Sequence, residues 1–109
     1  MTTIAWTPVC HYDELLPERG VAALIGRSQV AIFRTFDGML YALDNRDPFT
    51  GAHVLSRGIV GTRAGQPTVA SPLHKQAFDL ATGRCLDDAG VGVDTYPVRL
   101  RDRIVEVAV

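Results

Sequence analysis

Short apolar runs separated by turn-forming residues recur along the chain, and most have the length of a β-strand. Such runs at close spacing are typical of an all-β sandwich or small barrel. Asp37-Gly38 separates two of the runs and favours a two-residue hairpin turn, because both of its positions can adopt positive φ. Arg101-Asp102-Arg103 predicts another tight turn. The predicted strands cover residues 21–25, 30–36, 39–43, 59–62, 68–70, 76–80, 84–86, 96–100 and 104–107.

Three segments do not fit this pattern of short strands and turns. Residues 12–16 predict a single helical turn, which Pro17 ends. Residues 45–58 and 71–75 predict loops that join neighbouring hairpins. Because functional residues often lie on loops held by a rigid sheet, we expect the functional site in these two loops.

The bulk properties limit the class of protein. The chain has 109 residues, which suits a single domain spanning residues 1–109. Its 11 lysines and arginines nearly balance 12 aspartates and glutamates, so we expect no nucleic-acid partner. No signal peptide or apolar run of ~20 residues is found, which predicts a cytoplasmic protein without a membrane anchor. Cys10 and Cys85 are interpreted as buried free thiols, because nothing else indicates secretion.

The two loops contain few groups that bind metals. Asp47 and Phe49 are two positions apart in the first loop, and Ser71 and His74 are three apart in the second. Loops at the ends of neighbouring hairpins can face each other and enclose an ion, but a metal needs several converging N, O or S ligands. Only Asp47 and His74 are plausible ligands, so these residues alone predict no metal site.

Two longer segments carry a resemblance to a known family. Residues 41–52 are followed by the sequence Leu-Ser-Arg-Gly at 55–58, and residues 69–80 are followed by Thr-Gly-Arg-Cys at 82–85. Together they resemble Rieske proteins, which hold a [2Fe–2S] cluster between two loops. The resemblance implies an all-β Rieske-like fold, with an antiparallel sandwich or small barrel. A hairpin subdomain at about residues 44–87 would carry both loops.

The family holds its cluster with a Cys-x-His and a Cys-x-x-His motif. Carried over position by position, Asp47 stands in place of the first cysteine, Phe49 in place of the first histidine and Ser71 in place of the second cysteine. Only His74 matches the ligand set. The resemblance therefore implies degenerate cluster positions, no metal or other cofactor in this chain, and no catalytic residue.

This ligand-poor version is similar to the small-subunit family of assimilatory NAD(P)H-dependent nitrite reductases. The similarity lies in residues 6–10, 32–34 and 45–49. It implies an accessory, non-catalytic subunit whose partner, the large catalytic subunit, carries FAD, an iron–sulfur cluster and sirohaem and reduces nitrite to ammonia. The alternative is a Rieske-type electron-transfer ferredoxin with an altered metal site. An independent enzyme has the least support, since no catalytic constellation is present.

Each degenerate position also has a structural interpretation. Asp47 suits a turn cap and the Ser71 hydroxyl can bond loop N–H groups. The Phe49 ring either fills the space that a cluster would occupy or contacts a partner. His74 is either an interface residue or an ordinary loop histidine. Candidate partner contacts at the loop tips are Arg46, Phe49, Arg57, His74 and Lys75.

Overall fold

The computed structural model describes residues 5–109 and consists of antiparallel β-sheets. This confirms the predicted all-β fold. Within the described residues the helical segments are two 3-10 turns, η1 (Tyr12–Glu14) and η2 (Leu55–Arg57), so none of them is long enough to cross a membrane. The predicted helical turn at residues 12–16 corresponds to η1.

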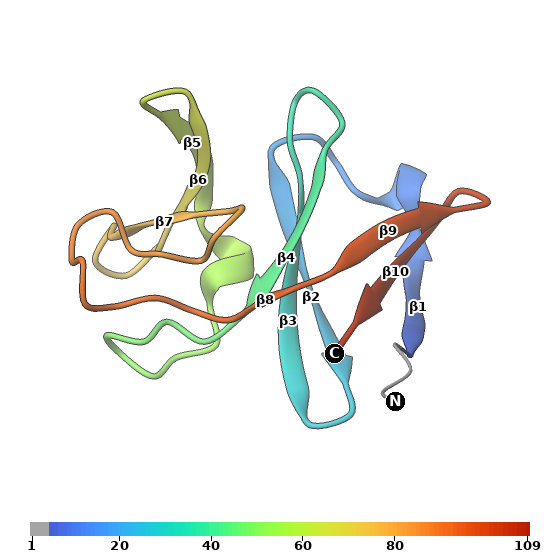
Figure 1. The fold of residues 1–109 in the computed structure, drawn as a ribbon, viewed down its shortest axis with the longest axis horizontal. Coiled ribbons are helices and arrows are strands. Elements are labelled where there is room, and N and C mark those ends of the chain that lie inside the picture. Colours follow the sequence, from blue (N-terminus) through green and yellow to red (C-terminus); the bar gives the residue numbers. More distant parts are fainter. Residues whose placement is uncertain (1–4) are drawn as a thin grey trace.

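Three sheets make up the fold (Figure 1). The first contains, in spatial order, β1 (Trp6–His11), β10 (Ile104–Ala108) and β9 (Val98–Arg101). The second contains β2 (Arg19–Ile25), β3 (Ser28–Arg34), β4 (Leu40–Asp44) and β8 (Thr95–Tyr96). The third contains β5 (Ile59–Arg63), β6 (Gln66–Ala70) and β7 (Ala77–Asp79). The chain between β4 and β8 forms this third sheet together with both predicted loops, as a hairpin subdomain on one side of the molecule.

Strand β3 connects two apolar cores. Its central residues have no exposed surface, and alternate side chains point to opposite faces of a strand. Ala31 and Phe33 pack into a core shared with the hairpin subdomain, which includes Phe78. Val30 and Ile32 pack into a second core, which is shared with β10. The four-stranded sheet therefore lies between the subdomain and the first sheet: one core holds the subdomain against it, and the other holds the first sheet.

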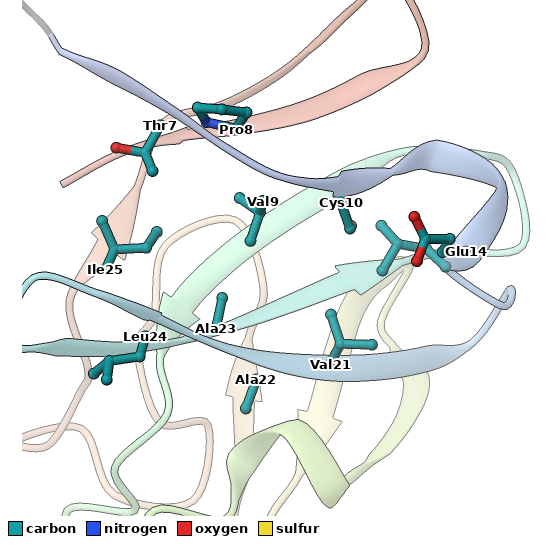
Figure 2. Close-up of a pocket in the computed structure, with 11 residues that line it drawn as sticks. Thr7, Pro8, Val9, Cys10, Glu14, Val21, Ala22, Ala23, Leu24 and Ile25 are labelled. Atoms are coloured by element: carbon teal, nitrogen blue, oxygen red, sulfur yellow. The ribbon is translucent and has the colours of Figure 1, made fainter.

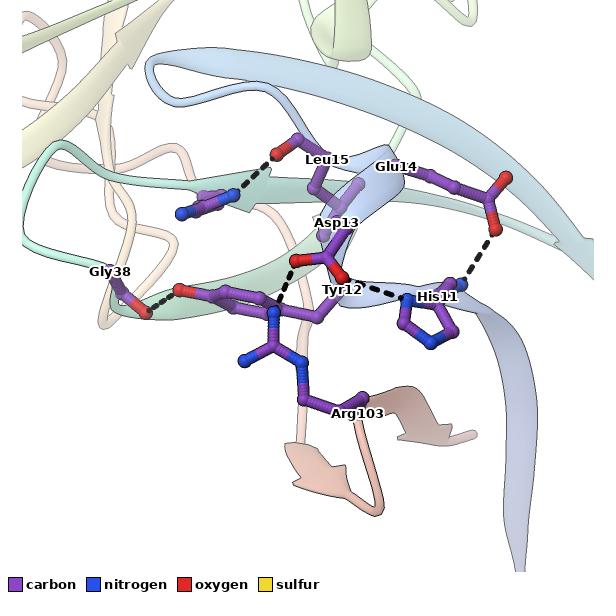
Figure 3. A network of polar contacts seen from close by, with 8 residues as sticks. His11, Tyr12, Asp13, Glu14, Leu15, Gly38 and Arg103 are labelled. Carbon is purple, nitrogen blue, oxygen red and sulfur yellow. Dashed lines mark hydrogen bonds and ion pairs between the residues drawn. The ribbon is translucent and has the colours of Figure 1, made fainter.

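A network around Tyr12 attaches the N-terminal segment to the central sheet (Figure 3). The Arg34 guanidinium stacks on the Tyr12 ring at 4.2 Å from its centroid and donates from Nη1 to the Leu15 carbonyl at 2.9 Å. The Tyr12 hydroxyl donates to the Gly38 carbonyl at 3.0 Å. Arg103, in the C-terminal turn, pairs with Asp13. Three chain segments that are distant in sequence therefore meet at one aromatic ring.

The structure corrects four local expectations. The predicted strand at residues 96–100 is interrupted at Pro97, which separates β8 of the second sheet from β9 of the first. A strand at residues 84–86 is wrong, because Arg84 and Cys85 form only isolated bridges. The Asp37-Gly38 turn is not a two-residue turn, because the ladder stops at the pair Arg34–Leu40 and only Gly38 of the two turn residues has positive φ, at 85°. The strand β1 is not among the predicted strands. Pro8 and a bulge between Pro8 and Cys10 weaken its pattern, as is common at a sheet edge.

Candidate functional site at the two loops

The first loop is closed around Asp47, which has no exposed surface. Its Oδ1 accepts a hydrogen bond from the Phe49 N–H at 2.8 Å, and its backbone carbonyl accepts from the Gly51 N–H at 2.8 Å. The Asp47 N–H donates to the Ala52 carbonyl at 2.8 Å. The interpretation of Asp47 as a turn cap is confirmed.

Asn45 fixes the start of the same loop and is 2% exposed. Its Oδ1 accepts from the Ser56 N–H at 2.7 Å, and its Nδ2 donates to the His53 carbonyl at 3.1 Å. The backbone carbonyl of Asn45 accepts a third hydrogen bond, from the Leu55 N–H at 3.0 Å. Asn45 therefore holds the far end of the loop and η2 against the end of β4, a role that the sequence pattern did not predict.

The second loop is organised in the same way around Ser71, which is 1% exposed. The Ser71 Oγ accepts from the Leu73 N–H at 3.3 Å, as expected from its sequence. The Ser71 carbonyl accepts from the Lys75 N–H at 3.0 Å, and the Ser71 N–H donates to the Gln76 carbonyl at 2.9 Å. The loop is thus a tight turn between β6 and β7, with Lys75 at a φ of 62°.

One buried hydrogen bond joins the two loops. The Ser71 hydroxyl donates to Asp47 Oδ2 at 2.6 Å, between residues 24 positions apart. Each oxygen of the carboxylate therefore has a partner, one in its own loop and one in the other. Because both side chains are almost fully buried, this bond is sheltered from water, and such bonds to charged groups are stronger than neutral ones.

The Phe49 ring lies against the subdomain core but is not enclosed by it. Its centroid is 6.3 Å from that of Phe78, and the two rings are tilted by 51°. Phe49 keeps 37% of its surface exposed. Packing and partner contact, the two interpretations of this ring, are therefore compatible, because one part of the ring is buried and another faces outward.

The remaining candidate contacts, Arg46, Arg57, His74 and Lys75, are exposed. The structure thus brings Asp47 and Ser71 together in the interior and leaves His74 on the surface. Leu73, at the tip of the second loop, is 48% exposed and was not a candidate from the sequence. An apolar side chain at a turn tip, next to proline, is the feature that could have indicated it.

Two glycines explain why the segments around the loops resemble the Rieske pattern. At Gly58 an added Cβ would lie 2.4 Å from the Ala70 carbonyl oxygen and 2.7 Å from Val69 Cγ2, so η2 can pack against β6 only without a side chain there. At Gly83 the φ is +78°, and an added Cβ would lie 2.1 Å from the Val93 carbonyl oxygen. Both requirements come from backbone packing.

The segment that follows β7 is tied to the same subdomain through Asp87. Its Oδ2 accepts from the Ala77 N–H at 2.8 Å, and its Oδ1 pairs with Arg63 at 3.0 Å. These hydrogen bonds, the one from Ala77 first, lower the pKa of the Asp87 carboxyl. The same segment is also closed by the Cys85 N–H, which donates to the Val91 carbonyl at 3.0 Å.

Both cysteines are free, as interpreted from the sequence, but the expected burial holds only for Cys85; neither lies in the two loops. Cys85 is buried in the subdomain core, while Cys10 is half-buried on β1. Burial, and to a smaller extent the charge of Glu14, raise the pKa of the Cys10 thiol. Within residues 5–109, no three His, Cys, Asp or Glu side chains converge as potential metal ligands.

A central antiparallel sheet with a hairpin subdomain that presents two facing loops defines a Rieske-type domain. The comparison with protein families agrees, because the model of the Rieske-like [2Fe-2S] domain matches residues 5–108. The chain belongs to this family.

Individual proteins similar to this chain show a more specific relationship within the family. The NADH nitrite reductase small subunit of Escherichia coli K12 is 44% identical over 103 residues, which cover 94% of this chain and 95% of the relative. A crystal structure from Mycobacterium tuberculosis, assigned to an NADH-dependent nitrite reductase small subunit, is 50% identical with a TM-score of 0.96, covering 99% of this chain and 97% of that chain. The nitrite reductase large subunit of Klebsiella oxytoca matches 89% of this chain at 40% identity, within 10% of its own length. The chain is homologous to the small subunits.

Proposed function

We propose that this chain is the accessory small subunit of a cytoplasmic, assimilatory NAD(P)H-dependent nitrite reductase. In this assembly the large subunit carries FAD, an iron–sulfur cluster and sirohaem, and it reduces nitrite to ammonia. The observation that carries the proposal is the match inside the Klebsiella oxytoca large subunit. Where one polypeptide contains both parts, the Rieske-like domain is held beside the catalytic part, and a separate chain would have to bind there instead.

The proposal includes a cluster-free domain, because the residues at the cluster positions do not fit a [2Fe–2S] centre. Such a centre needs two thiolates on one iron and two imidazoles on the other. The loops supply a carboxylate, a hydroxyl, a phenyl ring and the single imidazole of His74, and the Ser71 hydroxyl already donates to the Asp47 carboxylate at 2.6 Å. Inserting a cluster between them would break that buried bond. The chain therefore contributes binding and positioning, and no catalytic step takes place on it.

The loop tips are the surface that we propose docks on the large subunit. They combine an exposed part of Phe49 and the apolar Leu73 with the basic side chains of Arg46 and Lys75. Aromatic residues and arginine are enriched at protein interfaces, and charges at the rim guide association. A complementary surface would be apolar in its centre and acidic at its rim.

Co-expression with the large subunit tests the assembly. We expect a stable complex on affinity purification, and a faster NAD(P)H oxidation with nitrite in the complex than in the large subunit alone. Lys75→Glu should weaken the complex, and the matched charge reversal Arg101→Glu, on the distant strand β9, should not. Failure to co-purify, or equal effects of the two variants, would overturn the proposed function or its docking surface respectively.

Metal analysis tests the cluster-free state separately. We expect less than about 0.1 iron per chain and no [2Fe–2S] absorption in the chain purified without its partner. Two irons and two acid-labile sulfides per chain, or one stoichiometric metal ion, would support the alternative of an electron-transfer ferredoxin. The same measurement on Asp47→Cys with Ser71→Cys shows whether thiolates change the result.

A further inference from the structure

The hairpin subdomain contains the same short turn three times. In each turn the backbone carbonyl of the first residue accepts a hydrogen bond from the N–H four positions later, at 2.7–3.0 Å. The side-chain oxygen of the first residue accepts another from the N–H two positions later, at 2.8–3.3 Å. The three turns run from Asp47 to Gly51, from Ser71 to Lys75 and from Asp79 to Gly83. The first two belong to the two candidate loops, so the third provides an internal comparison.

The last residue of each turn has a left-handed backbone, with a φ of +80° at Gly51, +78° at Gly83 and 62° at Lys75. A turn closed in this way ends like a helix with an αL cap, where glycine is usual because a Cβ strains that conformation. At Gly51 the nearest atom to an added Cβ would be Arg46 Nη2 at 3.4 Å, which is an ordinary contact. The φ, and not a lack of space, therefore favours glycine there. Lys75 is the exception among the three turns.

The side chain of Lys75 does not offset this strain through a charge contact inside the chain. Lys75 is exposed, and within residues 5–109 its ammonium has no carboxylate within 4.0 Å. Only its backbone N–H takes part in the turn, and a glycine would supply the same N–H. A strained residue persists where the rest of the structure or a function requires it. The requirement for a lysine at this position therefore points outside the chain.

The other non-glycine residues with positive φ have explanations inside the chain. Two-residue hairpin turns, which favour positive φ, contain Ala64, Asp102 and Arg103. Glu18 lines a groove together with Arg19 and Arg57, so counter-charges of the chain itself lie beside it. Lys75 has no such explanation within residues 5–109.

We propose that Lys75 determines which protein docks at the two loops, and that its ammonium pairs with a carboxylate of the large subunit. The proposal rests on the proposed function for the identity of the partner. Leu73, two positions earlier, is 48% exposed, so the ion pair would lie beside an apolar contact that shields it from water. Charges at such a position select a partner by attraction and exclude others by repulsion. The chain thus keeps a strained turn, at a cost in stability, for a contact with another protein.

Lys75→Gly separates the strain from the contact. It places glycine where the two equivalent turns have it, so the Tm of the isolated chain should rise by about 2–6 °C. The same substitution should weaken binding of the large subunit by about tenfold, measured by calorimetry. A Tm equal to or below that of the unsubstituted chain would overturn the strain at Lys75, and an unchanged affinity would overturn the contact. No complex with the unsubstituted chain would overturn the proposed function together with this inference.

Two matched variants control for stability and for charge. Ala64→Gly relieves a positive φ of 52° in the β5–β6 turn, at the other end of β6 from the second loop, so it should raise the Tm similarly and leave binding unchanged. Lys75→Met keeps the stem and the strained backbone but removes the charge. It should keep the parent Tm, bind about tenfold more weakly, and make the affinity less sensitive to salt. Parent-like binding by Lys75→Met, or weaker binding by Ala64→Gly, would overturn the ion pair.

A further variant tests an alternative surface, the groove of about 460 Å³ between β1 and β2 (Figure 2). Its walls include Val9, Ala23 and Leu24, and Leu24 is 73% exposed. Leu24→Ser removes apolar surface there without changing the charge, and it should leave the affinity for the large subunit unchanged. A loss as large as that of Lys75→Gly would show that the large subunit covers this groove, and it would overturn the assignment of Lys75 as the residue that determines docking.

Discussion

The hydrogen bond between Ser71 and Asp47 should make one of the largest single contributions to the free energy of unfolding of the domain. Ser71→Ala removes the hydroxyl and leaves Asp47 Oδ2 without its partner, in a site where the aspartate has no exposed surface. Stranding a buried charged acceptor costs about 2–3 kcal/mol. The total stability of a domain this size is about 5–15 kcal/mol, so the variant should lose a large fraction of it. At about 4–8 °C per kcal/mol, the Tm should fall by roughly 10 °C or more.

Urea unfolding followed by circular dichroism measures this cost. Ser56→Ala is the matched control, because Ser56 uses its backbone N–H and not its hydroxyl to bond Asn45, and it should change stability by less than about 0.5 kcal/mol. A double-mutant cycle with Asp47→Ala should give a coupling energy above about 1 kcal/mol. If Ser71→Ala costs no more than Ser56→Ala, or if the cycle shows no coupling, the bond does not hold the two loops together.

Three other substitutions test neighbouring features of the subdomain. Asn45→Ala leaves the two backbone groups it satisfies unpaired and should cost about 2–3 kcal/mol in urea unfolding; a cost below 1 would be inconsistent with its role. Phe49→Ala should lose about 1–2 kcal/mol from ring packing, while Phe36→Ala, at a position 75% exposed, should lose almost none; similar losses would contradict the packing of Phe49. The lowered pKa of the Asp87 carboxyl means that its contribution to stability is complete above the unfolded-state value and is lost as pH falls through the folded-state value. Asp87→Asn should therefore lower the Tm at pH 7 and not at pH 2, and a Tm difference independent of pH would exclude this linkage.

Most strands could be predicted from short apolar runs bounded by turn-forming residues, because a buried strand requires such a run and the chain reverses at its ends. The runs at residues 30–36 and 39–43 correspond to β3 and β4, with ends displaced by two residues or fewer. The local pattern fails where pairing is weak or irregular. Pro8 interrupts the pattern of β1, and Cys85 lies in a loop although its neighbours resemble a strand.

The candidate site was predicted position by position, but not its central interaction. Asp47 and Ser71 each cap their own turn, which follows from the chemistry of their side chains in short loops. The bond between them depends on how two hairpins pack, and neither loop contains that information. Asn45 is a similar case. Its side chain, at the end of a strand, becomes buried and bonds the Ser56 N–H only when η2 folds back onto it.

The glycines of the frame and the residues between the two loops have different physical origins. Gly58 and Gly83 have to be glycine because neighbouring backbone atoms leave no room for a side chain, whether or not a metal is bound. The ligand positions respond only to what lies between the loops, and there Asp47 and Ser71 form a direct bond. A Rieske frame is therefore a property of subdomain packing, and the residues between the loops decide its chemistry. In this chain they cross-link the loops internally, so that another protein can contact the site only through its exposed side chains, which include Phe49, Leu73 and the basic residues Arg46 and Lys75.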